Sequence, residues 1–148
     1  MEVHLLCIGK LKDEALAQKE SQYTKRLTHF KFHLHELKSH SEDRLKEAQE
    51  IEKKILDIQA KKVILLTETG KTFTSPEFGH WFFDTLEKFS SIAFVIGGSA
   101  GFAPTITQKY QTHLSLGSLT YPHKIARLLI IEQLYRAQCL KSGHPYHK

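Results

Sequence analysis

The sequence predicts an α/β fold with a mostly parallel sheet of about five strands and helices on both faces. Short β-rich apolar runs alternate with longer helical segments, the order typical of parallel sheets. Two runs, residues 63–66 and 92–96, are apolar at every position, as expected for strands covered on both sides. With 148 residues, 41% of them hydrophobic, we expect residues 1–148 to form one domain with its own core.

The first half of the chain contains three predicted strands separated by two predicted helices. The segment 30–37 alternates apolar and polar residues with period two, which favours a strand with one buried face. The segment 41–59 is strongly charged but has its apolar residues on one side, which favours an amphipathic helix. We expect strands at residues 3–8, 30–37 and 63–66 and helices at residues 12–28 and 41–59.

The second half begins with a predicted turn at Gly70 and a helix that starts at Ser75. Ser75 is a suitable cap, Pro76 has the backbone angle of a first helical residue, and Glu77 suits the positive helix end. The segments expected to follow are a strand at 92–96, a short helix near Pro104, a brief strand at 113–116 and a helix at 122–141.

The last predicted helix is apolar over most of its surface, including Ile125, the run 128–131, Leu134 and Tyr135. A helix of this kind is usually buried on more than one side. Because the rest of so short a chain cannot easily cover it all, we expect a second copy of the chain to do so, giving a homodimer.

The formal net charge of +5 is unevenly placed. Residues 104–148 account for the whole excess, and no acid occurs between Glu87 and Glu132. This basic segment is either a solvated face or a surface for a polyanion such as RNA.

Several classes of protein are excluded by the sequence. The longest apolar runs have four or five residues, too few to span a membrane, and the N-terminus lacks the features of a secretory signal. Cys7 and Cys139 lie in apolar stretches and are expected to be reduced core residues. We therefore expect a cytoplasmic protein.

Common nucleotide and hydrolase motifs are also missing. The sequence contains no GxGxxG after the first strand, no GxxxxGK[ST] and no GxSxG. Two histidine pairs, His33 with His35 and His144 with His147, lack a cysteine or a suitably spaced acid to complete a ligand set. We expect no metal ion.

Two loops remain as candidates for a binding site. The glycine-rich segment 97–102 follows a buried strand and is either a plain tight turn or a wall on which a ligand lies close to the backbone. The segment 116–122 leads into the last helix, whose free N–H groups suit a polar ligand edge, although Thr120 could instead cap that helix.

Four motifs together carry a resemblance to a known family. They are IGGSAG at 96–101, SLGSLTYPH at 115–123, EQLYRA at 132–137 and HPYHK at 144–148, and their order and spacing match across the whole chain. The sequence closely resembles the pseudouridine N3-methyltransferases of the large ribosomal subunit, which belong to the SPOUT class.

The resemblance implies a specific fold and activity. Family members are small homodimers with a C-terminal trefoil knot, and they use S-adenosyl-L-methionine to methylate N3 of a pseudouridine in 23S rRNA of the assembled ribosome. Carried over position by position, the cofactor would be held by Leu66, Gly98, Gly117, Ser118, Leu119, Thr120, Tyr121 and Pro122. Ser99, Ala100 and Tyr121 differ from the residues common at these positions in the family. These differences bear on the expected affinity for the cofactor more than on the identification of the family.

The same resemblance implies residues on the substrate side. We expect His123, Arg136 and Tyr146 to be catalytic, with His123 accepting the N3 proton or orienting the base. His123 could instead cap or pack the helix, and Arg136 could pair with Glu132 one turn earlier. The residues expected to bind substrate are Arg127, Tyr135, His144 and His147.

Two other functions remain open at this point. The chain could be a ribosome- or RNA-binding factor without activity on the same fold, or a SPOUT methyltransferase that acts on tRNA. Binding of S-adenosylmethionine would distinguish an enzyme from a binding factor without activity. The HPYH ending favours rRNA over tRNA as the substrate.

Overall fold

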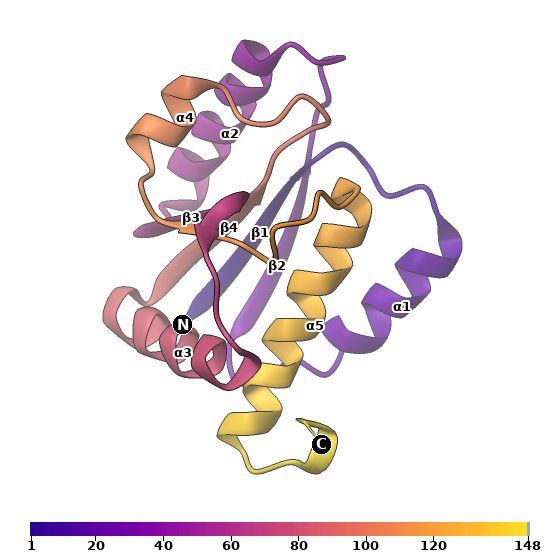
Figure 1. Cartoon of the computed structure of the whole chain (residues 1–148), viewed down its shortest axis with the longest axis vertical. Coiled ribbons are helices and arrows are strands. Elements are labelled where there is room, and N and C mark those ends of the chain that lie inside the picture. The colour runs from indigo at the N-terminus through magenta and orange to yellow at the C-terminus, as the bar shows by residue number, and fades with distance from the viewer. Residues whose placement is uncertain (148) are drawn as a thin grey trace.

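The computed structural model describes residues 1–147, except for the side chain of His147. Five parallel strands form one sheet in the order β2-β1-β4-β3-β5, with helices on both faces (Figure 1), so the predicted fold class is confirmed. The strands are β1 (Glu2–Ile8), β2 (Lys31–Leu37), β3 (Lys62–Lys71), β4 (Ser91–Ile96) and β5 (His113–Leu114). The helices are α1 (Glu14–Thr24), α2 (Arg44–Ile58), α3 (Ser75–Phe89), α4 (Pro104–Lys109), α5 (His123–Lys141) and the 3-10 turn η1 (Pro145–His147).

The sheet separates two apolar cores. Alternate residues of β1 point to opposite faces, with Val3 and Leu5 in one core and Leu6 and Ile8 in the other. The first core is closed by α1, α3 and α5, and the second by α2 and α4, which lie together on the other side of the sheet (Figure 1). The central strands are therefore covered on both faces, as their continuous apolar sequence predicts.

The strand order determines which loops meet. Strands β4, β3 and β5 are neighbours, and all run in the same direction. Their carboxyl ends therefore lie at one edge of the sheet, although the three loops that follow them are far apart in the sequence.

The start of α3 differs from the expectation. Thr74, not Ser75, is the N-cap: its side chain accepts a hydrogen bond from the N–H of Glu77, and the Glu77 carboxylate accepts one from the N–H of Thr74. This reciprocal capping box satisfies two N–H groups at once, which a Ser75 cap would not. The Ser75 hydroxyl instead donates to Oε1 of Gln133 on α5, at 2.9 Å.

The predicted turn at Gly70 is also wrong, because β3 continues to Lys71. A Cβ atom at position 70 would lie 2.7 Å from backbone carbons of His113 and Leu114. Glycine is therefore needed here for the close approach of β3 to β5. The trefoil knot implied by the resemblance stays a prediction.

A buried ion-pair network connects α5 to α1 and β2. Arg127 donates two hydrogen bonds of 2.7 Å to the carboxylate of Glu20 and one of 2.7 Å to Glu36. Both Arg127 and Glu20 are buried. Burial alone would raise the pKa of Glu36, but hydrogen bonds from Arg127 and from the N–H of Leu11 lower it below its usual value.

The cysteines are free and buried, which confirms the expectation of reduced core residues. Burial raises the pKa of the Cys7 thiol to about 12. Cys7 is therefore protonated near neutral pH and is not a nucleophile.

Replacing Arg127 by alanine is expected to destabilise the protein by about 3 to 5 kcal/mol, because it leaves the buried Glu20 carboxylate without its partner. Urea unfolding of the variant measures this loss. Lys124→Ala, a change on an exposed part of the same helix, should shift stability by less than about 0.5 kcal/mol. Equal stability of the two variants would show that the network contributes little.

Candidate active site

Residues 66–68 of β3 and the loops after β4 and β5 line one cavity of about 790 Å³ at the carboxyl edge of the sheet. The segments 97–102 and 116–122, singled out in the sequence, therefore meet in one site. Seven of the eight predicted cofactor residues line it: Leu66, Gly98, Gly117, Leu119, Thr120, Tyr121 and Pro122. Ser118 lies in the same loop but is not part of the lining.

Sequence reasoning missed other lining residues. Thr67 and Glu68 follow Leu66 in strand β3, Thr107 comes from α4, and Ala126 comes from the first turn of α5. Ala126 follows His123 by three residues and so shares its face of α5, a spacing that could have indicated it.

Ser115 joins two walls of the cavity. Its buried hydroxyl lies 3.1 Å from the carbonyl oxygen of Glu68 and 2.9 Å from that of Gly117, and it accepts a hydrogen bond from the N–H of Gly117 at 3.1 Å. One buried side chain thus fixes the loop after β5 against strand β3.

The glycine-rich loop is both a tight turn and a wall. The N–H of Gly101 donates to the carbonyl oxygen of Gly98 at 3.0 Å, and Gly101 has a φ of +76°, which favours glycine. The two interpretations of this loop are therefore compatible.

Gly117 has a φ of +139°, a backbone conformation that a residue with a side chain rarely adopts. The Tyr121 hydroxyl lies 3.4 Å from the position of a Cβ atom at 117. The loop thus turns back on itself, with Tyr121 over Gly117, at the mouth of the cavity.

His123 is the first residue of α5 and is exposed. Pro122 is the N-cap, and no side chain in the described part of the chain caps this helix, so the expectation of a Thr120 cap is wrong. The first N–H groups of α5 therefore face the cavity without a capping side chain, which suits a polar ligand edge.

A second cavity of about 330 Å³ shares the side chains of Ile96 and His123 with the first. Lys10, Lys12 and Lys124 also line it, and all three are exposed. This basic cavity was not predicted from the sequence, in which only the segments after residues 66, 96 and 116 stood out as candidate binding loops. The rule that ligands bind at the carboxyl ends of strands applies equally to β1, whose loop supplies Lys10 and Lys12.

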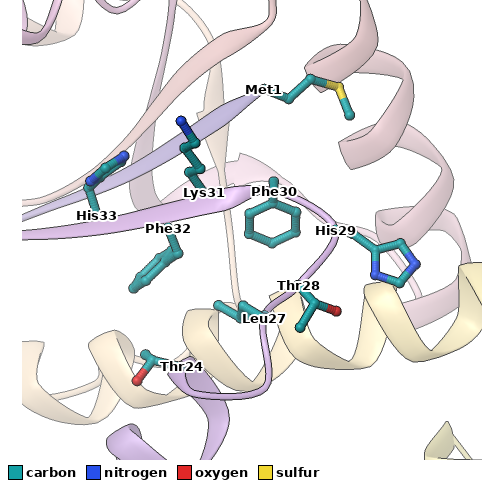
Figure 2. A pocket seen from close by; sticks show the side chains of 9 residues that line it. All are labelled: Met1, Thr24, Leu27, Thr28, His29, Phe30, Lys31, Phe32 and His33. Carbon is teal, nitrogen blue, oxygen red and sulfur yellow. The ribbon is translucent and has the colours of Figure 1, made fainter.

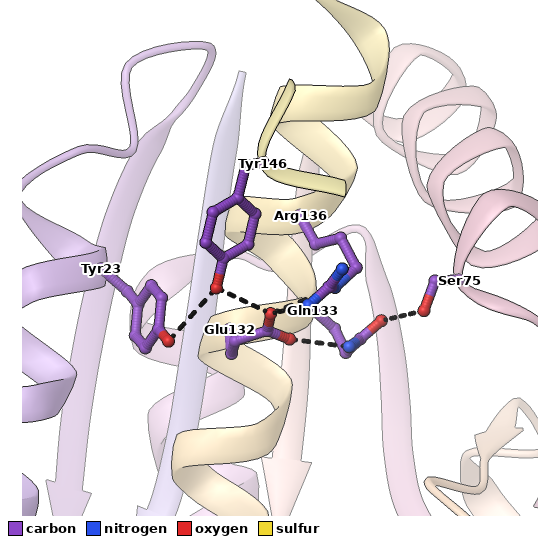
Figure 3. A network of polar contacts seen from close by, with 6 residues as sticks. All are labelled: Tyr23, Ser75, Glu132, Gln133, Arg136 and Tyr146. Atoms are coloured by element: carbon purple, nitrogen blue, oxygen red, sulfur yellow. Dashed lines mark hydrogen bonds and ion pairs between the residues drawn. The ribbon is translucent and has the colours of Figure 1, made fainter. Parts of the chain in front are cut away.

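A polar network surrounds Glu132 farther along α5 (Figure 3). The Glu132 carboxylate accepts hydrogen bonds from Arg136 at 2.6 Å and from the Tyr146 hydroxyl at 3.0 Å, and Tyr146 also bonds the hydroxyl of Tyr23 at 3.2 Å. Burial, together with these two bonds, raises the pKa of Tyr146, and the hydrogen bond to Glu132 raises that of Arg136. In this chain Arg136 pairs with Glu132, and Tyr146 attaches the C-terminal segment to α5 and α1.

The residues expected to be catalytic are not brought together within one chain. Arg136 follows His123 by 13 residues on one continuous helix, which corresponds to about 20 Å along its axis. Tyr146 lies with Arg136, whose guanidinium carbon is 5.1 Å from the centre of the tyrosine ring. Any site that uses all three residues therefore needs more than one chain.

The predicted substrate-binding residues have different surroundings. Arg127 lies in the buried ion network, and Tyr135 is buried with its ring 4.8 Å from that of Tyr146, so both stabilise the fold of this chain. His144 is exposed, and the side chain of His147 lies outside the described residues. Substrate binding by these four residues stays a prediction. Arg127 also lines the basic cavity, together with Lys10, Lys12 and Lys124.

A separate hollow of about 580 Å³ lies at the opposite end of the sheet, where β1 and β2 begin (Figure 2). Its lining comes from Met1, the end of α1, and the turn into β2, and the side chains of Lys31 and Phe32 leave the strand on opposite sides. No cluster of converging polar groups forms among these nine residues, so we do not assign it a role.

His33 and His35 lie beside His4 on the neighbouring strand. The ring centroids of His4 and His33 are 4.8 Å apart, and His4 Nδ1 lies 3.0 Å from His35 Nε2. Within residues 1–147 no group of three or more His, Cys, Asp or Glu is arranged to hold a metal ion.

None of the described helices combines the length and apolar composition that a bilayer-spanning segment requires.

Replacing Ser115 by alanine is expected to weaken, about fivefold, the binding of the S-adenosylmethionine that the family resemblance implies, because about one hydrogen bond holding the cavity walls together is lost. Isothermal titration calorimetry measures the affinity, and thermal unfolding shows whether the variant is folded. Ser21→Ala, on α1 and outside the cavity lining, should bind as the wild type does. Wild-type affinity of Ser115→Ala would contradict the role given to this hydroxyl.

Comparison with known proteins agrees with this architecture. A family profile described as "Predicted SPOUT methyltransferase" matches residues 1–147. A protein of Streptococcus uberis named "Ribosomal RNA large subunit methyltransferase H" is 37% identical, and one of the same name from Streptococcus pneumoniae is 35% identical, each over the full length of both chains. The chain belongs to the SPOUT methyltransferase family.

Proposed function

We propose that this protein uses S-adenosyl-L-methionine to methylate N3 of a pseudouridine in 23S rRNA of the assembled ribosome, acting in the cytoplasm as a homodimer. The observation that carries the proposal is the single cavity formed by residues 66–68 of β3 and the loops after β4 and β5. Its lining contains seven of the residues that the family resemblance assigns to the cofactor. The names of the two relatives support rRNA as the substrate.

The cavity suits the proposed cofactor in size and chemistry. Its volume of about 790 Å³ lies within the usual range for cofactor sites. Leu66, Leu119 and Pro122 offer apolar contacts for an adenine ring, while the backbone of the glycine-rich loop and the start of α5 offer hydrogen-bond donors. When bound, S-adenosylmethionine supplies a methyl group on a positively charged sulfur.

His123 is well placed to act on the acceptor. It lines both the cofactor cavity and the basic cavity, so its imidazole lies at their common boundary. The N3 imide must lose its proton when it accepts a methyl group, and a neutral imidazole can accept that proton near pH 7. The role we assign to His123 is to accept the N3 proton or to orient the base by a hydrogen bond.

The basic cavity is the proposed entry for the nucleotide. Lys10, Lys12 and Lys124 surround it and are exposed, so their ammonium groups can contact rRNA phosphates. These contacts position the RNA without reading its sequence, and the shape of the ribosome would supply the specificity.

A second copy of the chain would complete the site. Because Arg136 and Tyr146 lie about 20 Å from His123 along α5, a partner in a homodimer would have to bring its own Arg136 and Tyr146 to this cavity. Ile125, Leu128 and Leu129 on α5 are only half-buried in one chain and offer an apolar surface for the partner.

Methyl transfer to ribosomes tests the proposed function directly. Ribosomes from cells that lack the protein should gain one methylated pseudouridine in 23S rRNA when the purified protein and S-adenosylmethionine are added, as measured by mass spectrometry. Labelling of tRNA instead would show a different substrate. Ribosome binding without methyl transfer would show a binding factor without activity.

Mixed dimers test the composite site. His123→Ala and Arg136→Ala should each be nearly inactive, yet co-expression should restore about a quarter of wild-type activity, because half the dimers are mixed and each has one site with both residues intact. If both residues acted within one chain, the mixture would be no more active than its components. Co-expression of the wild type with a chain that carries both His123→Ala and Arg136→Ala provides the matched control for expression level.

A further inference from the structure

A buried carboxylate lies directly behind the glycine-rich loop. Glu47, in the first turn of α2, is only 3% exposed. Its Oε2 accepts a hydrogen bond of 3.1 Å from the N–H of His40. Its Oε1 is also buried and has no hydrogen-bond partner among the described residues.

This carboxylate determines which residue can occupy position 98. A Cβ atom there would lie 2.6 Å from Oε1 of Glu47 and 3.2 Å from its Cδ. Gly98 is not among the glycines with positive φ, so its backbone conformation does not require glycine. Glycine is favoured at position 98 by the close approach of the Glu47 carboxylate instead.

Gly98 also lines the cofactor cavity, so the carboxylate reaches the back of the cavity wall with no side chain of residue 98 in between. Helix α2 is held against the same loop by Arg44, whose guanidinium lies 3.4 Å from the carbonyl oxygen of Phe102. The charge is therefore fixed in position relative to the loop.

The fold alone does not account for this charge. The other fully buried acid, Glu20, is neutralised by two hydrogen bonds from Arg127, whereas within the described residues no ion pair involves Glu47. Burial of a carboxylate without a cation is unfavourable, and the unpartnered Oε1 adds to that cost. A positively charged ligand in the adjoining cavity would offset it.

We propose that Glu47 is a specificity-determining residue of the cofactor site: its carboxylate, held behind Gly98, favours the cationic methyl donor over the neutral product left after transfer. The proposal rests on the function proposed above. During transfer the S–CH₃ bond breaks and a bond from the methyl carbon to N3 forms. The electron pair of the broken bond stays on sulfur, which becomes a neutral thioether, and the N3 proton passes to the base.

The charge of Glu47 thus acts on one of the two ligands only. Substrate and product have nearly the same shape, so contacts with the cavity walls do not distinguish them well, whereas a fixed negative charge stabilises the sulfonium alone. The carboxylate would therefore favour exchange of spent product for a new donor.

Calorimetric titration of the full-length protein with S-adenosylmethionine and with S-adenosylhomocysteine tests this inference. Glu47→Gln keeps the shape and an acceptor for the His40 N–H but removes the charge. The variant should bind S-adenosylmethionine about tenfold more weakly than the wild type does and S-adenosylhomocysteine with unchanged affinity. Asp57→Asn is the matched control, since it removes one negative charge from an exposed position of the same helix and should leave both affinities unchanged.

Equal weakening of both ligands by Glu47→Gln, or no weakening of either, would overturn the proposal. If Glu47→Gln does not fold, Glu47→Asp and Glu47→Asn offer the same comparison between two side chains of equal length that differ in charge. Failure of the wild type to bind either ligand would overturn the proposed function, and this inference with it. If the wild type transfers methyl groups normally and the Glu47→Gln variant keeps the wild-type preference for S-adenosylmethionine, the Glu47 inference alone is overturned.

Discussion

The order of strands in the sheet is the constraint on which the rest of the structure depends. Because β4, β3 and β5 are parallel neighbours, the loops after β4 and β5 and residues 66–68 of β3 meet at one edge and form a single cavity. Two local contacts stabilise this arrangement: Gly70 lets β3 approach β5 closely, and Ser115 fixes the loop after β5 to β3. The cavity exists because the backbone has been brought together there.

Charge is distributed around the cavity in a way that suits a cationic cofactor and an anionic substrate. Lysines surround the neighbouring basic cavity, while a single carboxylate lies behind the glycine-rich loop. Arg127 also lines the basic cavity, but its charge is already paired with Glu20 and Glu36. The net charge of +5 therefore gives less information about RNA binding than the position of three exposed lysines.

The sequence predicted those parts of the structure that depend on local pattern. The apolar runs at 63–66 and 92–96 indicated central strands, and the segments after them and before α5 indicated the residues that line the main cavity. What it could not predict depends on contacts between distant residues. Arg127 resembled a surface cation because Glu20 precedes it by 107 positions, and Glu47 resembled one more charged residue of an amphipathic helix. Thr74 could have been recognised as the α3 cap from its spacing to Glu77, which a Ser75 cap does not satisfy.

The contact between Gly98 and Glu47 has an evolutionary consequence. Two positions 51 residues apart share one small volume, so a change at one affects the other: a larger residue at 98 fits only if the side chain at 47 becomes smaller or moves. A lineage that lost the acid would have space for a side chain at 98, and one that kept it would favour glycine there. Substitutions at these two sites should therefore arise in pairs, leaving a covariation signal that identifies the contact without any structure.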